Sequence, residues 1–395
     1  MRSLIPEKYQ TPFVYLALAT ITMSVTFSAW LAMLNNFSIE SANFTGAEIG
    51  MLQSLREVPG FLAFTVIYVL IFIKEQRLAL LSLGITSVGV FITGYFPSVI
   101  GLYLTTVLMS VGFHYYETVS QSLTLQWIAK DKTAHFMGRV LSVKAIASLL
   151  AFSSIWLLME QFSWGYQTTY ALFGAIGLVM TLLLTLSFVH FPEKTPQTKQ
   201  LILKKRYWLF YALTFFSGAR RQIFVVFAGF LMVEKFHYSV ADISALFLIN
   251  YVFNWLFAAK IGKFIGKVGE RATLRFEYIG LIIVFISYGL VENAELAAVL
   301  YVVDHLFFAL AIAIKTYFQK IAQPEDIAAS AGVSFSINHI AAVVIPALLG
   351  MLWIIQPDWV FYIGAGFAFC SLCLAMLIPN HPSQGMETRL MADNK

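Results

Sequence analysis

Charged residues are scarce in this chain of 395 residues: they make up only 12% of it, against roughly a quarter in an average soluble protein. Hydrophobic residues account for 59%, and the mean hydropathy is +0.76. Polar interruptions between Phe13 and Leu377 are short, so no segment remains for a separate soluble domain. A chain of this composition needs lipid as its solvent.

Sequence patterns that would indicate catalysis are missing as well. There is no zinc-ligand spacing, no nucleophile motif and no glycine-rich phosphate loop, so we expect no enzyme, no cofactor, no metal and no ATP-driven pump. The only cysteines, Cys370 and Cys373, form a CxxC inside an apolar run, where lipid denies a thiolate access to water; we expect them to pack as small hydrophobic residues. The net charge of +5 suits basic residues that flank membrane helices, so we expect no nucleic-acid partner.

Long apolar runs recur along the whole chain. The first, from Phe13 to about Asn35, is too long for a signal-peptide core and lacks a small-residue cleavage site, so we take it as a retained helix. A spanning helix needs about 20 largely apolar residues. On that measure we predict an all-α membrane protein with twelve transmembrane helices, at 12–35, 47–72, 78–96, 98–122, 137–159, 166–190, 207–232, 240–262, 272–291, 295–319, 329–354 and 358–379.

Lysines and arginines indicate the orientation of these helices. Twelve helices place both termini on one side of the membrane, and the connections on the opposite side hold only Lys235. Basic residues collect on the cytoplasmic side. We therefore expect cytoplasmic termini and a bacterial inner-membrane location, based on Lys74, Arg77, Lys130, Lys132, Arg139, Lys194, Lys199, Lys204, Lys205, Arg206, Lys260, Lys263, Lys267 and Arg271.

The two halves of the chain resemble each other at a constant offset of 194 residues. The matched positions are Ala47 with Ala241, Glu48 with Asp242, Ile49 with Ile243, Leu52 with Leu246, Arg77 with Arg271, Gly138 with Gly332, and Ser142 with Ser336. This pattern predicts two parallel six-helix repeats, 1–190 and 207–395, joined by a basic cytoplasmic linker, 191–206. A solute site is expected between such halves, near the bilayer midplane.

A glycine-spaced basic stretch lies between the eighth and ninth predicted helices, with Gly262, Lys267, Gly269 and Arg271. It is similar to the cytoplasmic loop motif of the major facilitator superfamily, and the resemblance covers essentially the whole chain. The resemblance implies alternating access, in which one half rocks against the other. The arginine before a glycine in helix 4 and the Gly-Pro pair in helix 5 of drug/proton antiporters are missing, which argues against a typical drug antiporter.

Several charged residues and histidines fall inside predicted spans, where a charge costs at least about 2.5 to 3.5 kcal/mol at a helix centre. Arg220 and Arg221, in the middle of the seventh helix, offer the planar fork that suits carboxylate or phosphate. With Arg56 and Lys144 they form a candidate site for an organic anion or zwitterion. The alternative is pure salt bridging with the acids Glu57, Glu117 and Asp304.

Proton carriers are expected among the same acids. His114 and Glu117 are three residues apart, which places them on one helix face, and Asp304 is expected near mid-depth in the tenth helix. Adjacent residues point about 100° apart on a helix, so we expect only one of Arg56 and Glu57 to face a cavity.

These observations favour a monomeric, proton-coupled secondary transporter that moves a small solute across the bilayer. One alternative is efflux of amphipathic, drug-like compounds, because the abundant aromatic residues and methionines could line an apolar binding pocket. An alternative of another class is a transport-inactive membrane receptor or sensor.

Overall fold

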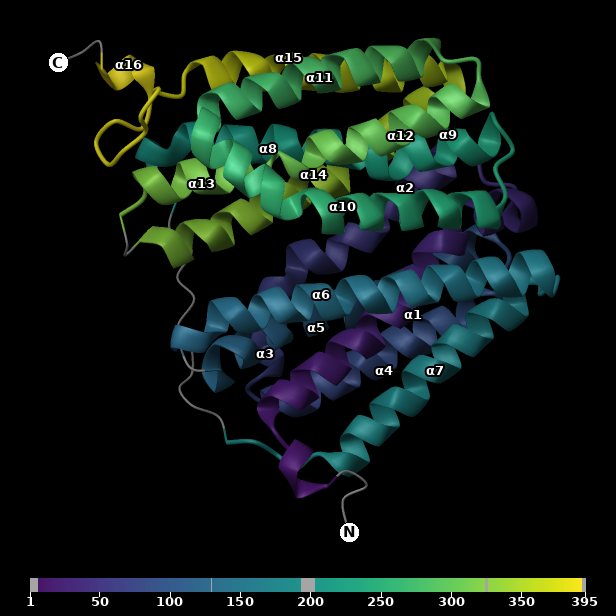
Figure 1. Cartoon of the computed structure of the whole chain (residues 1–395). Coiled ribbons are helices and arrows are strands. Elements are labelled where there is room, and N and C mark those ends of the chain that lie inside the picture. The colour runs from purple at the N-terminus through teal and green to yellow at the C-terminus, as the bar shows by residue number, and fades with distance from the viewer. Residues whose placement is uncertain (1–5, 129, 193–202, 324–325, 393–395) are drawn as a thin grey trace. The chain divides into compact units, whose positions relative to one another are not determined.

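The computed structural model describes residues 6–128, 130–192, 203–323 and 326–392. Within them the secondary structure is helical, apart from one isolated bridge between Ser383 and Met386 (Figure 1). Ten helices among the described residues are long and apolar enough to cross a membrane. The other two predicted spans are also helical, so the predicted fold class is confirmed.

The helices of the first half follow the predicted spans closely. They are α1 (Pro12–Ala42), α2 (Gly46–Phe61), η2 (Leu62–Thr65), α3 (Val66–Val69), α4 (Glu75–Thr93), α5 (Val99–Trp127), α6 (Lys130–Trp156), η3 (Leu157–Gln161) and α7 (Tyr166–Ser187), after a short η1 (Glu7–Tyr9). Pro59 lies inside α2 and cannot donate a backbone hydrogen bond. The α-helix ends two residues beyond it, at Phe61, and the predicted span 47–72 continues with the 3₁₀ turn η2.

The second half begins with η4 (Lys205–Tyr207), α8 (Trp208–Gln222), the π-helical turn η5 (Ile223–Ala228) and α9 (Gly229–Glu234), which together form one span. It continues with α10 (Val240–Val268), α11 (Glu270–Leu290), α12 (Ala294–Ala309), α13 (Ile312–Ile321), α14 (Ile327–Ile355), α15 (Pro357–Met376) and α16 (Arg389–Ala392). The helices α12 and α13 together form the predicted tenth span.

The chain divides into two compact units, and each takes one short segment from the other half of the sequence. The first unit comprises Met1–Phe44, Leu55–Gln197 and Tyr238–Leu248, and the second comprises Thr45–Ser54, Thr198–His237 and Ile249–Lys395. The segments 45–54 and 239–248 are related by the offset of 194 residues.

Both of these segments begin with the same helix-capping arrangement. The backbone N–H of Thr45 donates to Glu48 Oε2 over 2.9 Å, and the N–H of Ser239 donates to Asp242 Oδ2, also over 2.9 Å. Each hydroxyl contacts the same carboxylate. In both segments the carboxylate three residues on therefore satisfies a backbone donor at the start of α2 or α10. The repeat found in the sequence therefore reappears as matching local structure.

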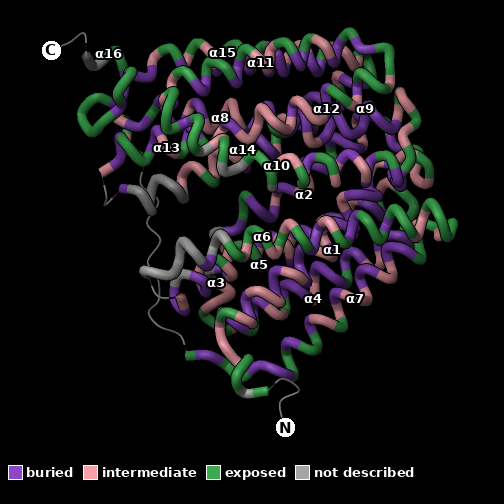
Figure 2. Tube along the Cα trace, in the orientation of Figure 1, coloured by how far each residue is buried: buried purple, intermediate pink, exposed green. Residues whose placement is uncertain are grey.

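Buried and exposed positions alternate along the helices (Figure 2). One cluster of buried residues in the first unit is rich in aromatic side chains. The Tyr15 ring centroid lies 5.7 Å from that of Trp127 and 5.5 Å from that of Phe188. Gln76 joins the start of α4 to the segment after α7, because its amide donates to Val189 O over 3.0 Å and accepts from Phe191 N over 2.9 Å.

Glycines allow neighbouring helices of the first unit to approach closely. A Cβ atom at Gly89 would lie 2.7 Å from the Met109 backbone, and one at Gly112 would lie 2.5 Å from Ser82 O, so α4 and α5 pack almost backbone to backbone. A Cβ at Gly174 would meet Phe91 in the same way. Small residues at helix interfaces are the usual solution in lipid.

The basic stretch between α10 and α11 differs from the turn expected from the sequence. Helix α10 continues through Gly262 and Lys267 to Val268, and Gly269 alone separates it from α11. The backbone of Gly269 has φ +85°, a conformation that residues with a side chain rarely adopt. Lys267, in the last turn of α10, suits the negative end of the helix dipole, which supports the extension beyond residue 262.

Candidate functional site

Arg220 lies at the centre of a buried polar cluster in the second unit. Its side chain is fully buried near the end of α8, and its Nη1 lies 3.6 Å from Oε1 of Glu277 on α11, which is also fully buried. The guanidinium Nε donates to Phe216 O over 3.3 Å, and Cζ lies 4.5 Å from the Tyr278 ring centroid. The ion pair is longer than a hydrogen bond, so charge and the aromatic ring hold the guanidinium more than directed hydrogen bonds do.

Asp304 on α12 is the second acid of this cluster. It is fully buried and within electrostatic range of Arg220, Tyr288 and Tyr301. Neither of its carboxylate oxygens has a hydrogen-bond partner among the described residues, and the same holds for both oxygens of Glu277. Buried polar atoms without partners are rare in folded proteins and mark positions where a proton, a water or a ligand is to be expected.

The charges of this cluster do not balance if every group is ionised. Glu277 contacts the guanidinium and Asp304 lies within its electrostatic range. Within this cluster of described residues, two carboxylates therefore stand against one guanidinium, and one negative charge is left over. An isolated buried charge costs several kcal/mol, whereas a protonated carboxyl group costs far less. The cluster can therefore bind a proton and release it when a compensating charge or water enters.

Local structure fixes how α8 presents its arginine. A Cβ atom at Gly218 would lie 2.5 Å from Asn338 Oδ1, so α8 approaches α14 closely two residues before Arg220. The π-helical turn η5 follows directly after Gln222. Single π-turns inside α-helices occur frequently at functional sites. Arg221 points in a different direction from Arg220 and is exposed.

The sequence reasoning missed Glu277, although the residue carried a detectable signal. It is the eighth residue of α11, inside a largely apolar stretch that was already predicted as a span. An acid in such a position is a functional candidate by the same rule that singled out Asp304.

The charged and histidine candidates of the first unit differ in environment: some are paired or buried, and others are exposed. Arg56 and Glu57 form an ion pair with each other on α2, with side-chain exposures of 11% and 6%. His114 is buried on α5, and its ring lies 5.1 Å from that of Phe113. Glu117 on α5 and Lys144 on α6 are exposed.

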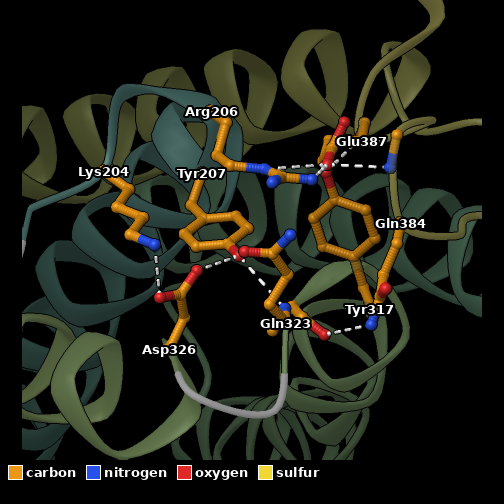
Figure 3. Close-up of polar contacts among 10 residues, drawn as sticks. Lys204, Arg206, Tyr207, Tyr317, Gln323, Asp326, Gln384 and Glu387 are labelled. Atoms are coloured by element: carbon orange, nitrogen blue, oxygen red, sulfur yellow. Dashed lines mark hydrogen bonds and ion pairs between the residues drawn. The ribbon is translucent and has the colours of Figure 1, made fainter.

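Polar contacts join several helix ends of the second unit (Figure 3). Asp326 Oδ1 lies 2.6 Å from Lys204 Nζ, and the Tyr207 hydroxyl donates to Oδ2 over 2.6 Å. These two partners lower the pKa of Asp326 below its usual range, the ammonium having the larger effect. Arg206 pairs with Glu387, and the Tyr317 hydroxyl donates to the backbone oxygen of Glu387 over 2.6 Å.

The basic stretch between α10 and α11 contributes further polar contacts between helix ends of the second unit. Arg271 Nη1 donates to Asn380 Oδ1 over 2.7 Å, which joins the start of α11 to the segment after α15. Lys320 Nζ lies 2.7 Å from Glu270 Oε1 and joins α13 to α11. Lys267 is exposed.

The comparisons with known proteins agree with the fold. The profile of the Major Facilitator Superfamily matches residues 13–346, so the chain belongs to this superfamily of membrane transporters. No curated protein sequence matches it.

Solved structures of several transporters are similar to this one. A mutant of the nucleoside transporter NupG has a TM-score of 0.76 at 17% identity, with 93% of this chain and 99% of that chain covered. A bacterial homologue of the human lysosomal transporter Spinster has a TM-score of 0.73 at 13% identity, with 99% of both chains covered. A peptide transporter of the POT family has a TM-score of 0.70 at 12% identity, with 93% and 96% covered. At these identities the likeness concerns the fold alone.

Proposed function

We propose that the protein is a proton-coupled secondary transporter of a small organic anion or zwitterion. The observation that carries this proposal is the buried cluster in which Glu277 contacts the Arg220 guanidinium and Asp304 lies within its electrostatic range. A proton taken up by the cluster removes the uncompensated charge, and its release restores that charge. Such a change in charge is a direct way to link a proton gradient to a change in conformation.

Within this proposal the residues have separate roles. Asp304 carries the proton, because its oxygens have neither a hydrogen-bond partner nor an ion pair among the described residues. Glu277 lies 3.6 Å from Arg220 and holds the guanidinium in place. Arg221, which is exposed, contacts the anionic group of the solute. Arg56 and Lys144 supply further positive charge, and His114, Glu117 and Glu57 form a second candidate proton path in the first unit.

Transport proceeds by alternating access, with residues 1–190 and 207–395 as the moving halves and 191–206 as the linker. The positive-inside rule supports cytoplasmic termini, and we assign the chain to a bacterial inner membrane as a monomer without enzymatic activity. Export of amphipathic compounds is the alternative within transport, and a transport-inactive receptor is the alternative outside it. Nucleosides and peptides belong in any solute screen, because transporters of the same fold are named for them.

The test has two stages. A thermal-shift screen of the purified protein with carboxylates, phosphate esters, nucleosides, peptides and cationic dyes identifies the solute, since a bound ligand stabilises the native state. Uptake of that solute into proteoliposomes, driven by a pH gradient, is then compared for wild type, Asp304→Asn and Glu295→Gln. Glu295 is an exposed acid on the same helix and serves as the matched control.

We expect Asp304→Asn to exchange solute across the membrane but to lose accumulation driven by the pH gradient, while Glu295→Gln behaves like wild type. The exchange assay shows that the variant is folded. Wild-type accumulation in Asp304→Asn, Glu277→Gln and Glu117→Gln alike would rule out proton coupling through these acids. A screen in which only cationic dyes bind would favour the export of amphipathic compounds.

A further inference from the structure

The surface of the first unit carries an apolar groove of about 590 Å³ along α4, which we call the α4 groove. Helices α4, α5 and α7 form its walls, and Leu81, Val88 and Leu108 are among the residues that line it. All three side chains are exposed, by 48%, 38% and 36%. The groove lies outside the buried polar cluster described above and has no part in the proposed transport mechanism.

Gly84 leaves the middle of this groove open. A Cβ atom at this position would meet no atom within 4 Å, whereas Cβ atoms at Gly89 and Gly112, where α4 packs against α5, would clash. The same helix therefore uses glycine for two purposes. On its inner face glycine brings two backbones together, and on its outer face it leaves a space that a ligand can occupy.

The polar residues of the groove lie at one of its ends. Arg77 is in the first turn of α4 and Thr185 is in the last turn of α7, and the hydrogen bond from Gln76 to Val189 O brings these two helix ends together. The Thr185 hydroxyl donates to Thr181 O of its own helix. The other end of the groove, near Val88 and Leu108, is apolar.

Arg77 has no hydrogen bond or ion pair within the described ranges. Its counterpart in the second repeat, Arg271, donates to Asn380 and joins α11 to the segment after α15. In the first repeat the neighbouring Gln76 makes the corresponding connection, so Arg77 is not needed for it. An exposed guanidinium without a partner remains at the mouth of an apolar groove.

The dimensions of the groove match one leaflet of a bilayer. Arg77 and Val88 are eleven residues apart on α4, which corresponds to about 16 Å at 1.5 Å per residue. The hydrocarbon core of a bilayer is about 30 Å thick, so one leaflet spans about 15 Å. A chain that starts at Arg77 would end near the bilayer midplane.

We propose that the α4 groove binds one phospholipid of the cytoplasmic leaflet, with an acyl chain along Gly84 and an anionic headgroup at Arg77. The apolar walls suit the chain, and the guanidinium suits a phosphate, which it can bind through two parallel hydrogen bonds. Basic residues between transmembrane helices on the cytoplasmic side are a recurrent feature of anionic-lipid sites.

Native mass spectrometry of the intact protein in detergent tests this site with dioleoyl phosphatidylglycerol and dioleoyl phosphatidylcholine, which share their chains and differ in headgroup charge. We expect wild type to retain one phosphatidylglycerol more tightly than phosphatidylcholine. Gly84→Leu fills the groove and should lose the retained lipid of either kind. Gly366→Leu is the matched control, since Gly366 on α15 also has open space around its Cβ position.

The headgroup contact is tested separately. Arg77→Gln should reduce the preference for phosphatidylglycerol about fivefold, which corresponds to about 1 kcal/mol for one basic residue. Arg275→Gln, an exposed arginine near the start of α11, removes the same charge and should keep the preference. Equal retention of both lipids by wild type, or a retained lipid in Gly84→Leu or an unchanged preference in Arg77→Gln, would overturn the proposal.

Discussion

Two adjacent arginines of α8 have opposite environments. Arg220 is fully buried against Glu277 and Tyr278, whereas Arg221 is exposed. The helix geometry alone requires this divergence, because neighbouring side chains point about 100° apart. A buried guanidinium is costly unless it is paired, whereas an exposed one is stabilised by solvation.

Substituting each arginine by lysine separates a structural role from a binding role. Arg220→Lys retains the charge but loses the contact with the Tyr278 ring and the fork that faces Glu277. We expect a lower melting temperature, because the substitution weakens a buried ion pair. Removing one partner of such a pair entirely costs about 3 to 5 kcal/mol of stability. Solute affinity of the folded protein should stay close to that of wild type.

Arg221→Lys should have the opposite effect. The melting temperature should remain that of wild type, and affinity for an anionic solute should fall because a point charge replaces a bidentate fork. Thermal unfolding and isothermal titration on both variants provide the comparison. If both variants melt lower while affinity is unchanged, the arginine pair is structural and the anionic-solute proposal loses its main support.

Glu277 shows what can and cannot be learned from a single residue in the sequence. Its presence in a span was visible, but its partner was not, because nothing in the spacing of α8 and α11 indicates which faces meet. Asp304 and Arg220 were both predicted as candidates, and the fold brings them into one cluster. The pairing of Arg56 with the adjacent Glu57 also depends on side-chain rotamers that no helical pattern specifies.

At the scale of elements, Asp326 joins the start of the second repeat to the connection between α13 and α14. It accepts from Lys204 and Tyr207, and the Tyr207 hydroxyl in turn accepts from Gln323 N over 3.1 Å (Figure 3). Its pKa is lowered by these contacts, so the ionised form is more stable in the folded state than in the unfolded state.

This lowering predicts a definite pH dependence for Asp326→Asn. An aspartate in an unfolded chain has a pKa of about 3.9, and that of Asp326 in the folded state lies below it. The stabilisation is therefore complete above about pH 4 and is lost as the pH falls through the lower, folded-state value. The variant should melt below wild type at neutral pH, and the difference should shrink towards about pH 3.

Lys204→Gln removes the ammonium from the same contact and should reproduce this pattern more weakly, because Tyr207 still donates to Asp326. Differential scanning fluorimetry of wild type and both variants across a pH series measures the effect. A melting difference that stays constant down to pH 3 would show that ionisation of Asp326 does not stabilise this connection.

At the scale of the whole molecule, the repeat and the basic residues lead to one prediction about orientation. Lys263 lies near the end of α10 on the basic side, and Glu295 lies in the first turn of α12 on the other side. Both side chains are exposed. The native Cys370 and Cys373 are exposed and free, so each is first replaced by Ser.

In this cysteine-free background, a membrane-impermeant maleimide should label Glu295→Cys in intact cells. It should label Lys263→Cys only after permeabilisation, since the positive-inside rule places the basic connections in the cytoplasm. Labelling of Lys263→Cys, but not of Glu295→Cys, in intact cells would reverse the assigned orientation.

The sequence by itself predicted an all-helical membrane protein of the major facilitator superfamily, and the family profile and the ten long apolar helices among the described residues agree with that prediction. Lipid has no hydrogen bonds to offer, so each spanning segment must satisfy its backbone internally as a helix, and length and hydropathy then reveal it. Tertiary structure alone decided which side chains meet. It determined the contact of Arg220 with Glu277, the connection through Asp326 and the α4 groove, and it left the Asp304 oxygens without a hydrogen-bond partner among the described residues. These features depend on the rotation of each helix about its axis and on its neighbours, and hydropathy does not specify either quantity.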